Sequence, residues 1–362
     1  MADLKEIKRF AASQDLPEAV VEKDYAISVA LKLLSESPLA KLVAFKGGTA
    51  LRKIYFPKTR FSEDLDFTAL TEDQVEAWRL VKETFEEKES NGIHFTIASK
   101  EEKAGFQSSS LKAIIKFIGP LAHPQSIRLD ISFREKLLEK TEWRPVQDTY
   151  ALGSKDIQCL SMPEIIAEKV RALFGRDDPK DAFDLYFLSK NGYKPNSGLV
   201  NEKLAAAGSR ISQEKLAEKL EVLRHSWKRK LGELLPKVPD FDEVVVEVKK
   251  RMESEDFENK GRLLTEKQRL EKELKAMKNR INEQARLYEE LGGRLARNPL
   301  EIGFSGISTP GVFTGTIFPF DKMKEIEEIK KMLQEYRDNQ TKLAKIKREL
   351  GEEEDYADRY VR

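Results

Sequence analysis

The stretch from Phe45 to Phe67, FKGGTALRKIYFPKTRFSEDLDF, constrains this chain more than any other part of it. Apolar residues lead into Gly47-Gly48, a run with helical character follows, and Asp64 and Asp66 then alternate with apolar residues. A Gly-Gly turn lets the backbone approach a phosphate, and the first N–H groups of the next helix can receive its negative charge. Two carboxylates at i and i+2 of a strand lie on one face, where they can share a divalent metal.

These pieces together predict a site for a nucleoside triphosphate and a divalent cation, Mg²⁺ or Mn²⁺. Asp64 and Asp66 are the expected metal ligands, and the nucleotide-binding residues expected beside them are Gly47, Gly48, Thr49, Arg60 and Ser62. A Gly-Gly pair alone is a common turn, and Asp-Leu-Asp alone is a common exposed strand end. The prediction therefore rests on their conjunction in this order.

The wording of this stretch resembles the signature of the nucleotidyltransferase superfamily. GGTALRKIY followed by RFSEDLDF is similar, more narrowly, to the AbiEii/AbiGii toxin family, the enzymes of certain bacterial and archaeal toxin–antitoxin systems. Superfamily members supply a third carboxylate from a later strand. The alternating segment IRLDISF at 127–133 has Asp130 in that position, as a third metal ligand or as the acceptor of a proton. A solvent-facing aspartate is the alternative.

A second block again resembles the AbiEii family. A lysine lies inside a predicted helix that starts near Ser161, an arginine lies near its end, and a K-D-x-x-D-L stretch follows on the next helix. The corresponding residues are Lys169, Arg176, Asp181 and Asp184. The resemblance implies that Lys169, with Arg176, faces the nucleotide and that one of the two aspartates takes part in the activity. The alternative is a solvated ion pair of little consequence.

Composition limits the other possibilities. The chain has 362 residues, which is enough for two domains, and a formal net charge of +1, which argues against a globally basic nucleic-acid coat. A single cysteine excludes an internal disulfide framework, and the three scattered histidines make a zinc site an unfavoured interpretation. No secretion signal and no membrane-spanning run is recognised, so we expect a cytoplasmic protein without a membrane partner.

We expect an α+β fold. Residues 1–236 are predicted to form a nucleotidyltransferase-like domain, a mixed sheet with flanking helices and a helical extension. Residues 237–362 are predicted to form an all-helical antiparallel coiled-coil hairpin with a Gly/Pro/Phe-rich tip near 302–320. Apolar residues recur in steps of four and three along both arms. If facing positions sum to 624, Gln284 pairs with Gln340 and fixes the register. The apolar tip is a candidate docking surface for a partner or a second copy of the chain.

Three functions remain open at this stage. The first is a nucleotidyltransferase toxin that transfers a nucleotide from an NTP to RNA, such as the tRNA 3′ end, and is opposed by a cognate antitoxin; the acceptor and the antitoxin follow from the resemblance. The second is a small-molecule nucleotidyltransferase of the antibiotic-modifying type. The third is a nucleotide-binding scaffold that acts through its coiled coil. The basic segment 225–230, HSWKRK, is a further candidate for nucleic-acid contact, with a solvated helix end as the alternative.

Overall fold

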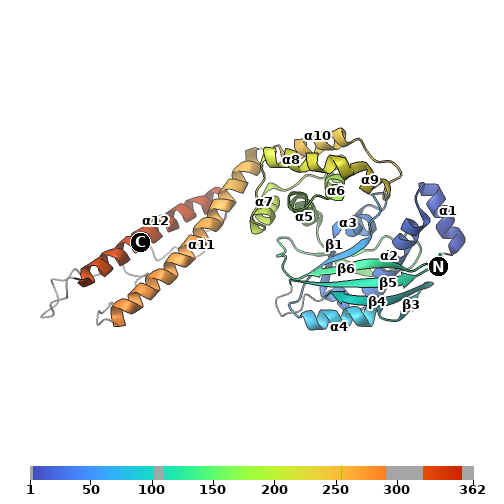
Figure 1. Cartoon of the computed structure of the whole chain (residues 1–362), viewed down its shortest axis with the longest axis horizontal. Helices are drawn as coiled ribbons and strands as arrows, with labels where there is room; N and C mark the ends of the chain where they lie inside the picture. Colours follow the sequence, from blue (N-terminus) through green and yellow to red (C-terminus); the bar gives the residue numbers. More distant parts are fainter. Residues whose placement is uncertain (1–2, 102–108, 254, 291–320, 353–362) are drawn as a thin grey trace. The chain divides into compact units, whose positions relative to one another are not determined.

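The computed structural model describes residues 3–101, 109–253, 255–290 and 321–352. The chain divides into two compact units (Figure 1). The first contains Met1–Lys203 and Ile211–Ser254, and the second contains Leu204–Arg210 and Glu255–Arg362. Among the described residues, no helix is long and apolar enough to cross a membrane.

The described part of the first unit is built on an eight-stranded sheet with the order β3-β4-β5-β6-β2-β1-β8-β7. The β1–β8 and β2–β6 pairs are parallel, and the other neighbours are antiparallel. The strands are β1 (Val43–Lys46), β2 (Asp64–Ala69), β3 (Lys88–Ser90), β4 (Ile93–Glu101), β5 (Ser110–Ile118), β6 (Gln125–Ser132), β7 (Glu142–Pro145) and β8 (Asp156–Cys159).

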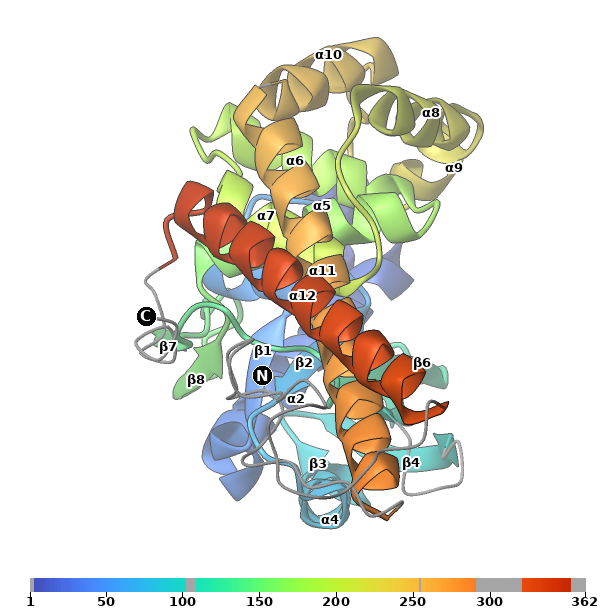
Figure 2. The ribbon, with the colours of Figure 1, turned by 90° about the vertical axis from the view of Figure 1, so that its left-hand side faces the viewer.

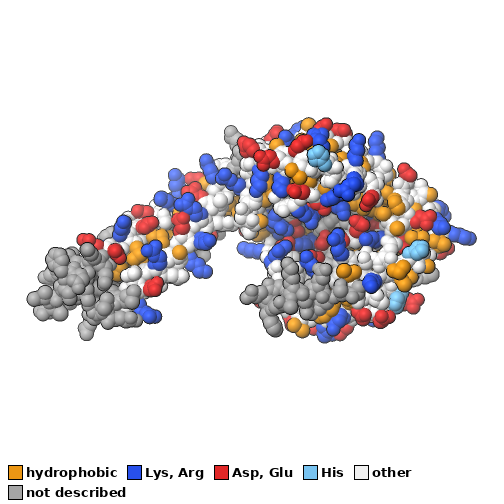
Figure 3. Space-filling view, viewed as in Figure 1, with side chains coloured by type: hydrophobic (Ala, Val, Ile, Leu, Met, Phe, Trp, Pro, Cys, Tyr) orange, Lys and Arg blue, Asp and Glu red, His pale blue; other side chains and the backbone are white. Residues whose placement is uncertain are grey.

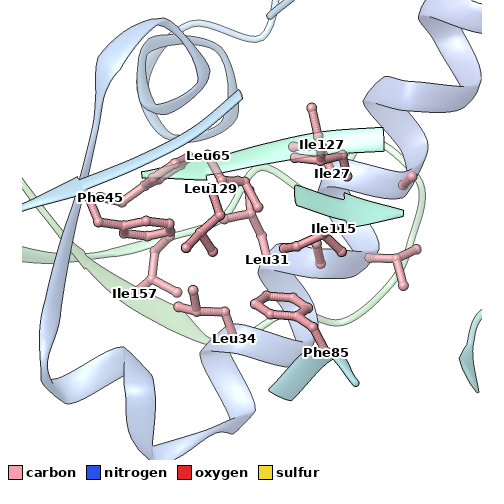
Figure 4. Close-up of a cluster of buried hydrophobic side chains, with 14 of the residues drawn as sticks. Ile27, Leu31, Leu34, Phe45, Leu65, Phe85, Ile115, Ile127, Leu129 and Ile157 are labelled. Carbon is pink, nitrogen blue, oxygen red and sulfur yellow. The ribbon is translucent and has the colours of Figure 1, made fainter. Parts of the chain in front are cut away.

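Alternation along β2, β5 and β6 gives the sheet one apolar face. Helices α1 (Leu4–Gln14), α2 (Glu18–Glu36) and α4 (Gln74–Phe85) bury this face, and their apolar side chains join those of the strands in one core. Figure 4 shows Leu31 and Leu34 of α2 beside Phe45, Leu65 and Leu129 of the sheet. The polar side chains of the same strands therefore lie on the opposite face.

The remaining helical segments lie before β1, after the Gly-Gly turn and after the last strand. The segment η1 (Pro38–Lys41) precedes β1, and the turn opens α3 (Gly47–Ala50), which continues as the π-helical segment η2 (Leu51–Tyr55). The later helices are α5 (Met162–Gly175), α6 (Pro179–Lys190), α7 (Ser197–Ala206), α8 (Gln213–Leu223), η3 (Arg224–Ser226), α9 (Trp227–Gly232) and α10 (Phe241–Met252). Helix α6 has Asp178 as N-cap and a proline at its first position, two residue types that favour a helix start.

The position of Trp227 contradicts the interpretation that the basic segment 225–230 stacks a base on its tryptophan. Its side chain is buried, its indole N–H donates to the carbonyl oxygen of Pro239 at 2.9 Å, and its ring packs edge-on against Phe241. A buried ring with its only donor in use cannot stack on a base. The tryptophan of the basic segment is therefore part of the core.

The second unit contains two long helices, α11 (Glu255–Glu290) and α12 (Asp321–Glu349). They lie across each other in Figure 2 and run antiparallel, because Ile281 packs on Ile329 and Leu333 while Leu270 packs on Ile346. Lys and Arg alternate with Asp and Glu over their outer surfaces (Figure 3). The predicted fold class, a mixed α+β domain followed by a helical hairpin, is confirmed.

The predicted register of the hairpin is wrong. A constant sum of 624 would set Ile281 against Leu343, whereas Ile281 packs with Leu333, a difference of nearly three helical turns. Gln340 is exposed; the buried amide is Asn339, which donates to the sulfur of Met277 at 3.7 Å. Interdigitation of the apolar side chains sets the register, rather than pairing of the two glutamines. The tip at 302–320 lies outside the described residues.

Candidate active site

Three charged side chains lie in one row across the sheet. Lys46 of β1 is the register partner of Asp66 of β2, and Asp66 is the partner of Asp130 of β6. Gly47 lies next to this row and has to be a glycine. A Cβ at this position would lie 2.6 Å from Oδ2 of Asp66, and its φ of +79° also favours glycine. Burial, and then repulsion from Asp64, raises the pKa of the Asp66 carboxyl above its usual range.

Asp64 lies on the same face as Asp66 but is held differently. The guanidinium of Arg128 donates to both of its carboxylate oxygens, from Nε at 2.9 Å and from a terminal nitrogen at 3.1 Å. Arg128 is itself largely exposed. The structure thus brings the predicted pair onto one face, with one member facing the cavity described next and the other engaged by an arginine.

A cavity of about 310 Å³ lies over Asp66 and Asp130. Its wall opposite the carboxylates comes mainly from α5, and side chains of both signs gather in this part of the unit (Figure 3). The predicted site residues that line the cavity are Gly47, Asp66, Asp130, Lys169, Arg176 and Asp181. A concave, strongly charged site with convergent cations suits a phosphate-rich ligand.

The second sequence block forms a buried ion-pair cluster. Lys169 Nζ lies 3.0 Å from Oδ1 of Asp181 and 2.8 Å from Oδ2 of Asp184. Burial alone would lower the pKa of Lys169, but the two carboxylates more than offset it and raise the pKa. Arg176 donates twice to Asp181, at 2.7 and 3.0 Å, and although burial opposes it, these cations lower the pKa of Asp181 to about 2. With the Lys169 side chain only 7% exposed, the solvated ion pair is ruled out.

Four predicted nucleotide-binding residues do not line the cavity. Thr49 and Arg60 are buried, and the Thr49 hydroxyl is hydrogen-bonded to the Ser62 hydroxyl and to the backbone carbonyl of Asp64. A Cβ on Gly48 would lie 2.4 Å from a terminal nitrogen of Arg60, so this glycine makes room for the arginine. These residues support the turn and the start of β2, and Asp184 likewise lies outside the cavity lining.

Sequence reasoning missed several cavity residues. Glu135 accepts hydrogen bonds from Lys46 and, at 2.9 Å, from Arg171, while Glu168 lies 3.7 Å from Lys46. Arg134 is a further cation that lines the cavity and was not predicted. A charge at the end of the apolar strand VAFK was the one local signal for Lys46. Nothing local marks Glu135 or Arg171, because their role follows from their packing against β1.

The donor set at this row fits a divalent cation. As placed, the described side chains form no group of three or more His, Cys, Asp or Glu that could hold a metal ion, and Asp64 is hydrogen-bonded to Arg128. Yet Asp66 and Asp130 are direct neighbours, and the raised pKa of Asp66 reflects burial together with repulsion from Asp64 and Asp130. Carboxylate oxygens are hard ligands that suit Mg²⁺ and Mn²⁺, and a bound cation would relieve the repulsion between these carboxylates.

A family model described as nucleotidyl transferase AbiEii toxin, type IV TA system, matches residues 29–247, well over half of the chain. The chain belongs to the AbiEii family. It is therefore a nucleotidyltransferase and a toxin of a type IV toxin–antitoxin system, which confirms the resemblance drawn from the two sequence blocks. The family implies an NTP as substrate and a cognate antitoxin as partner.

The fold is also that of a solved structure. MenT4, a nucleotidyltransferase toxin from Mycobacterium tuberculosis H37Rv, superimposes with a TM-score of 0.51 over 70% of this chain and 91% of its own, at 19% sequence identity. At that identity the likeness shows the fold alone. No match was found among the curated proteins.

Proposed function

We propose that this chain is a Mg²⁺-dependent toxin that transfers a nucleoside monophosphate from an NTP to a hydroxyl of an RNA acceptor, such as the tRNA 3′ end. The observation that carries the proposal is the cavity, in which Asp66 and Asp130 face the cations of β1 and α5. A triphosphate needs both a carboxylate-held divalent cation and fixed positive charge, and residues able to supply each line one space. The cognate antitoxin would act by opposing this activity.

Asp64, Asp66 and Asp130 are the residues that would hold the divalent cation. When bound, such a cation neutralises charge on the phosphate oxygens and orients them. The Asp66–Asp130 pair is the part of this set that faces the cavity. In this proposal Asp130 would also accept the proton of an attacking hydroxyl.

The cations of the cavity wall would receive the departing pyrophosphate. Lys46 comes from β1, Arg171 from α5 and Arg176 from the C-cap of α5, and Lys169 of α5 is paired with Asp181 and Asp184. Most of the catalysis of phosphoryl transfer is positioning and charge neutralisation, so fixed cations in a partly closed space are the expected machinery. Gly47 leaves the space beside Asp66 clear of a side chain.

The two aspartates of α6 take different roles in this proposal. Asp181 lines the cavity and holds Lys169 and Arg176. Asp184 is buried behind it, between Lys169 and Arg60. We therefore assign Asp181 to the substrate side and Asp184 to positioning.

The test is transfer of radiolabel. The purified chain is incubated with each α-labelled NTP and Mg²⁺, and with either total tRNA or a panel of small hydroxyl-bearing acceptors. We expect label in RNA, loss of this label with Asp66→Ala, and growth arrest on induction of the wild type but not of Asp66→Ala. Label in a small acceptor alone would overturn the RNA assignment, and absence of any transfer would overturn the proposal.

A further inference from the structure

The polar face of β5 and β6 carries an exposed, basic strip. On β5, Leu111, Ala113, Ile115 and Phe117 enter the core, so the intervening residues point away from it. Beside them on β6, Arg128 is the register partner of Ile114 and Ser126 the partner of Lys116. We call this surface the β5–β6 face and define it as Lys112, Ile114, Lys116, Ile118, Ser126 and Arg128.

Lysines and isoleucines alternate along this face. Lys112 and Lys116 are exposed, Ile114 is half-buried, and Ile118 is 46% exposed. Lys112 and Lys116 are four residues apart, about 13 Å along the strand, which is roughly two phosphate spacings of an extended nucleic-acid strand. Cations at this spacing can track a phosphate backbone while the apolar side chains between them contact bases.

The β5–β6 face is continuous with the proposed metal ligands. Asp130 is the register partner of Lys112, whose Nζ lies 3.8 Å from its Oδ2, and Arg128 holds Asp64. The cavity extends the other way, over the carboxyl end of β6, where Ser132 and Arg134 line it. Arg128 and Lys116 are outside that lining. The row of carboxylates thus separates the cavity from the face.

Phosphoryl transfer requires the attacking and leaving oxygens to be roughly in line through the phosphorus. If the cations of the cavity receive pyrophosphate, the attacking hydroxyl must arrive from the other side of the carboxylate row. We propose that the β5–β6 face receives the acceptor as a single-stranded RNA end, with its phosphates on Lys112, Lys116 and Arg128. This inference rests on the proposed function and adds the path by which the acceptor reaches Asp130.

Lys116 is the residue on which to test the path, because it is exposed and lies four register positions from Asp130, outside the row of carboxylates. Binding of a short fluorescein-labelled single-stranded RNA to the full chain is measured by anisotropy at several salt concentrations. Lys116→Glu should weaken binding by roughly three- to tenfold and lower the slope of log K against log salt by about one. Lys116→Ala should change both in the same direction by less.

The matched control is Lys82→Glu, the same charge reversal at an exposed position of α4, on the opposite side of the sheet. It should leave RNA binding unchanged, and neither reversal should alter affinity for a non-hydrolysable NTP analogue. If the wild type binds and labels RNA, but the Lys116→Glu and Lys82→Glu variants bind RNA equally well, the proposed acceptor path is wrong and the proposed function stands. If the wild type binds no RNA and labels a small acceptor, the proposed function fails and the path with it.

Discussion

Arg60 and Asp184 are 124 residues apart in the sequence and form a two-point hydrogen-bonded ion pair, with both donor–acceptor distances at 2.8 Å. Both side chains are buried, at 3% and 1% exposure. The pair joins the segment before β2 to helix α6, and Gly48 makes room for the guanidinium. It therefore holds the two sequence blocks in the relative position that the cavity requires.

Removing one partner of this pair should be costly. Arg60→Ala leaves Asp184 buried with only Lys169 as a counter-charge, and we expect a loss of about 3–5 kcal/mol in the free energy of unfolding. The double variant Arg60→Met, Asp184→Leu should recover a large part of that loss. Urea unfolding, followed by circular dichroism, measures the free energy of unfolding of the wild type, the single variant and the double variant. A loss below about 1 kcal/mol for Arg60→Ala would contradict the structural role.

Asp66→Asn should separate activity from stability. The substitution removes a charge that burial and Asp64 disfavour, so the metal-free protein should be at least as stable as the wild type. Nucleotide transfer and Mn²⁺ binding should both fall to background. Asp156→Asn, at an exposed position of β8, is the control that keeps both. Wild-type turnover by a folded Asp66→Asn protein would remove Asp66 from the proposed site.

Lys46→Met should weaken nucleotide binding. Lys46 lies beside Asp66 in the cavity, and its loss leaves Glu135 and Glu168 with less compensation next to the incoming phosphates. Burial lowers the pKa of this lysine although Glu168 and Asp66 oppose the shift. We expect a roughly tenfold increase in the Kd of an NTP analogue by calorimetry, about 1.4 kcal/mol. The exposed Lys41→Met serves as control; equal Kd values for the two variants would show that Lys46 does not face the nucleotide.

Lys53 should make stability depend on pH. It is buried against Asp24, 2.7 Å from Oδ2, and burial, only partly offset by that carboxylate, lowers its pKa from 10.5 to about 8. Between these values the unfolded chain binds a proton that the folded chain has lost. The free energy of unfolding should therefore rise with pH in this window, by up to about 1.4 kcal/mol per pH unit, with no contribution to the slope below it.

The measurement is urea unfolding of the wild type and Lys53→Met at several pH values between 8 and 10.5. Because the other titrating groups are common to both proteins, the difference between them isolates Lys53. The wild type should gain stability relative to the variant as pH rises. A difference that is constant or falls with pH would contradict the lowered pKa of Lys53 in the folded chain.

The hairpin register can be read by disulfide formation. In a Cys159→Ala background, Met277→Cys with Asn339→Cys should crosslink within one chain under mild oxidation, since the two native side chains are in contact. Gln284→Cys with Gln340→Cys should crosslink poorly, because Gln340 is exposed. Mobility on a non-reducing gel at low protein concentration distinguishes the two pairs. Preferential crosslinking of 284 with 340 would restore the register of facing positions that sum to 624.

Short-range pattern was enough to predict the strands and helices that carry the candidate site, and the side chains that share a face. Alternation in β2, β5 and β6 placed Asp64, Asp66 and Asp130 opposite the core, and cap residues located the start of α6. Apolar steps along α11 and α12 identified buried residues such as Leu270, Ile281 and Leu333. Such periodicities report which way a side chain points, and direction is a local property of a helix or strand.

Partners across the molecule were decided only by the tertiary structure. Strand order set Lys46 beside Asp66, and the packing of α5 and α6 on that end of the sheet brought Arg171 to Glu135 and Asp184 to Arg60. The hairpin register, likewise, depends on how two apolar seams interdigitate. Each of these contacts joins residues distant in sequence, and a local pattern shows that a charge is present without showing which charge will face it.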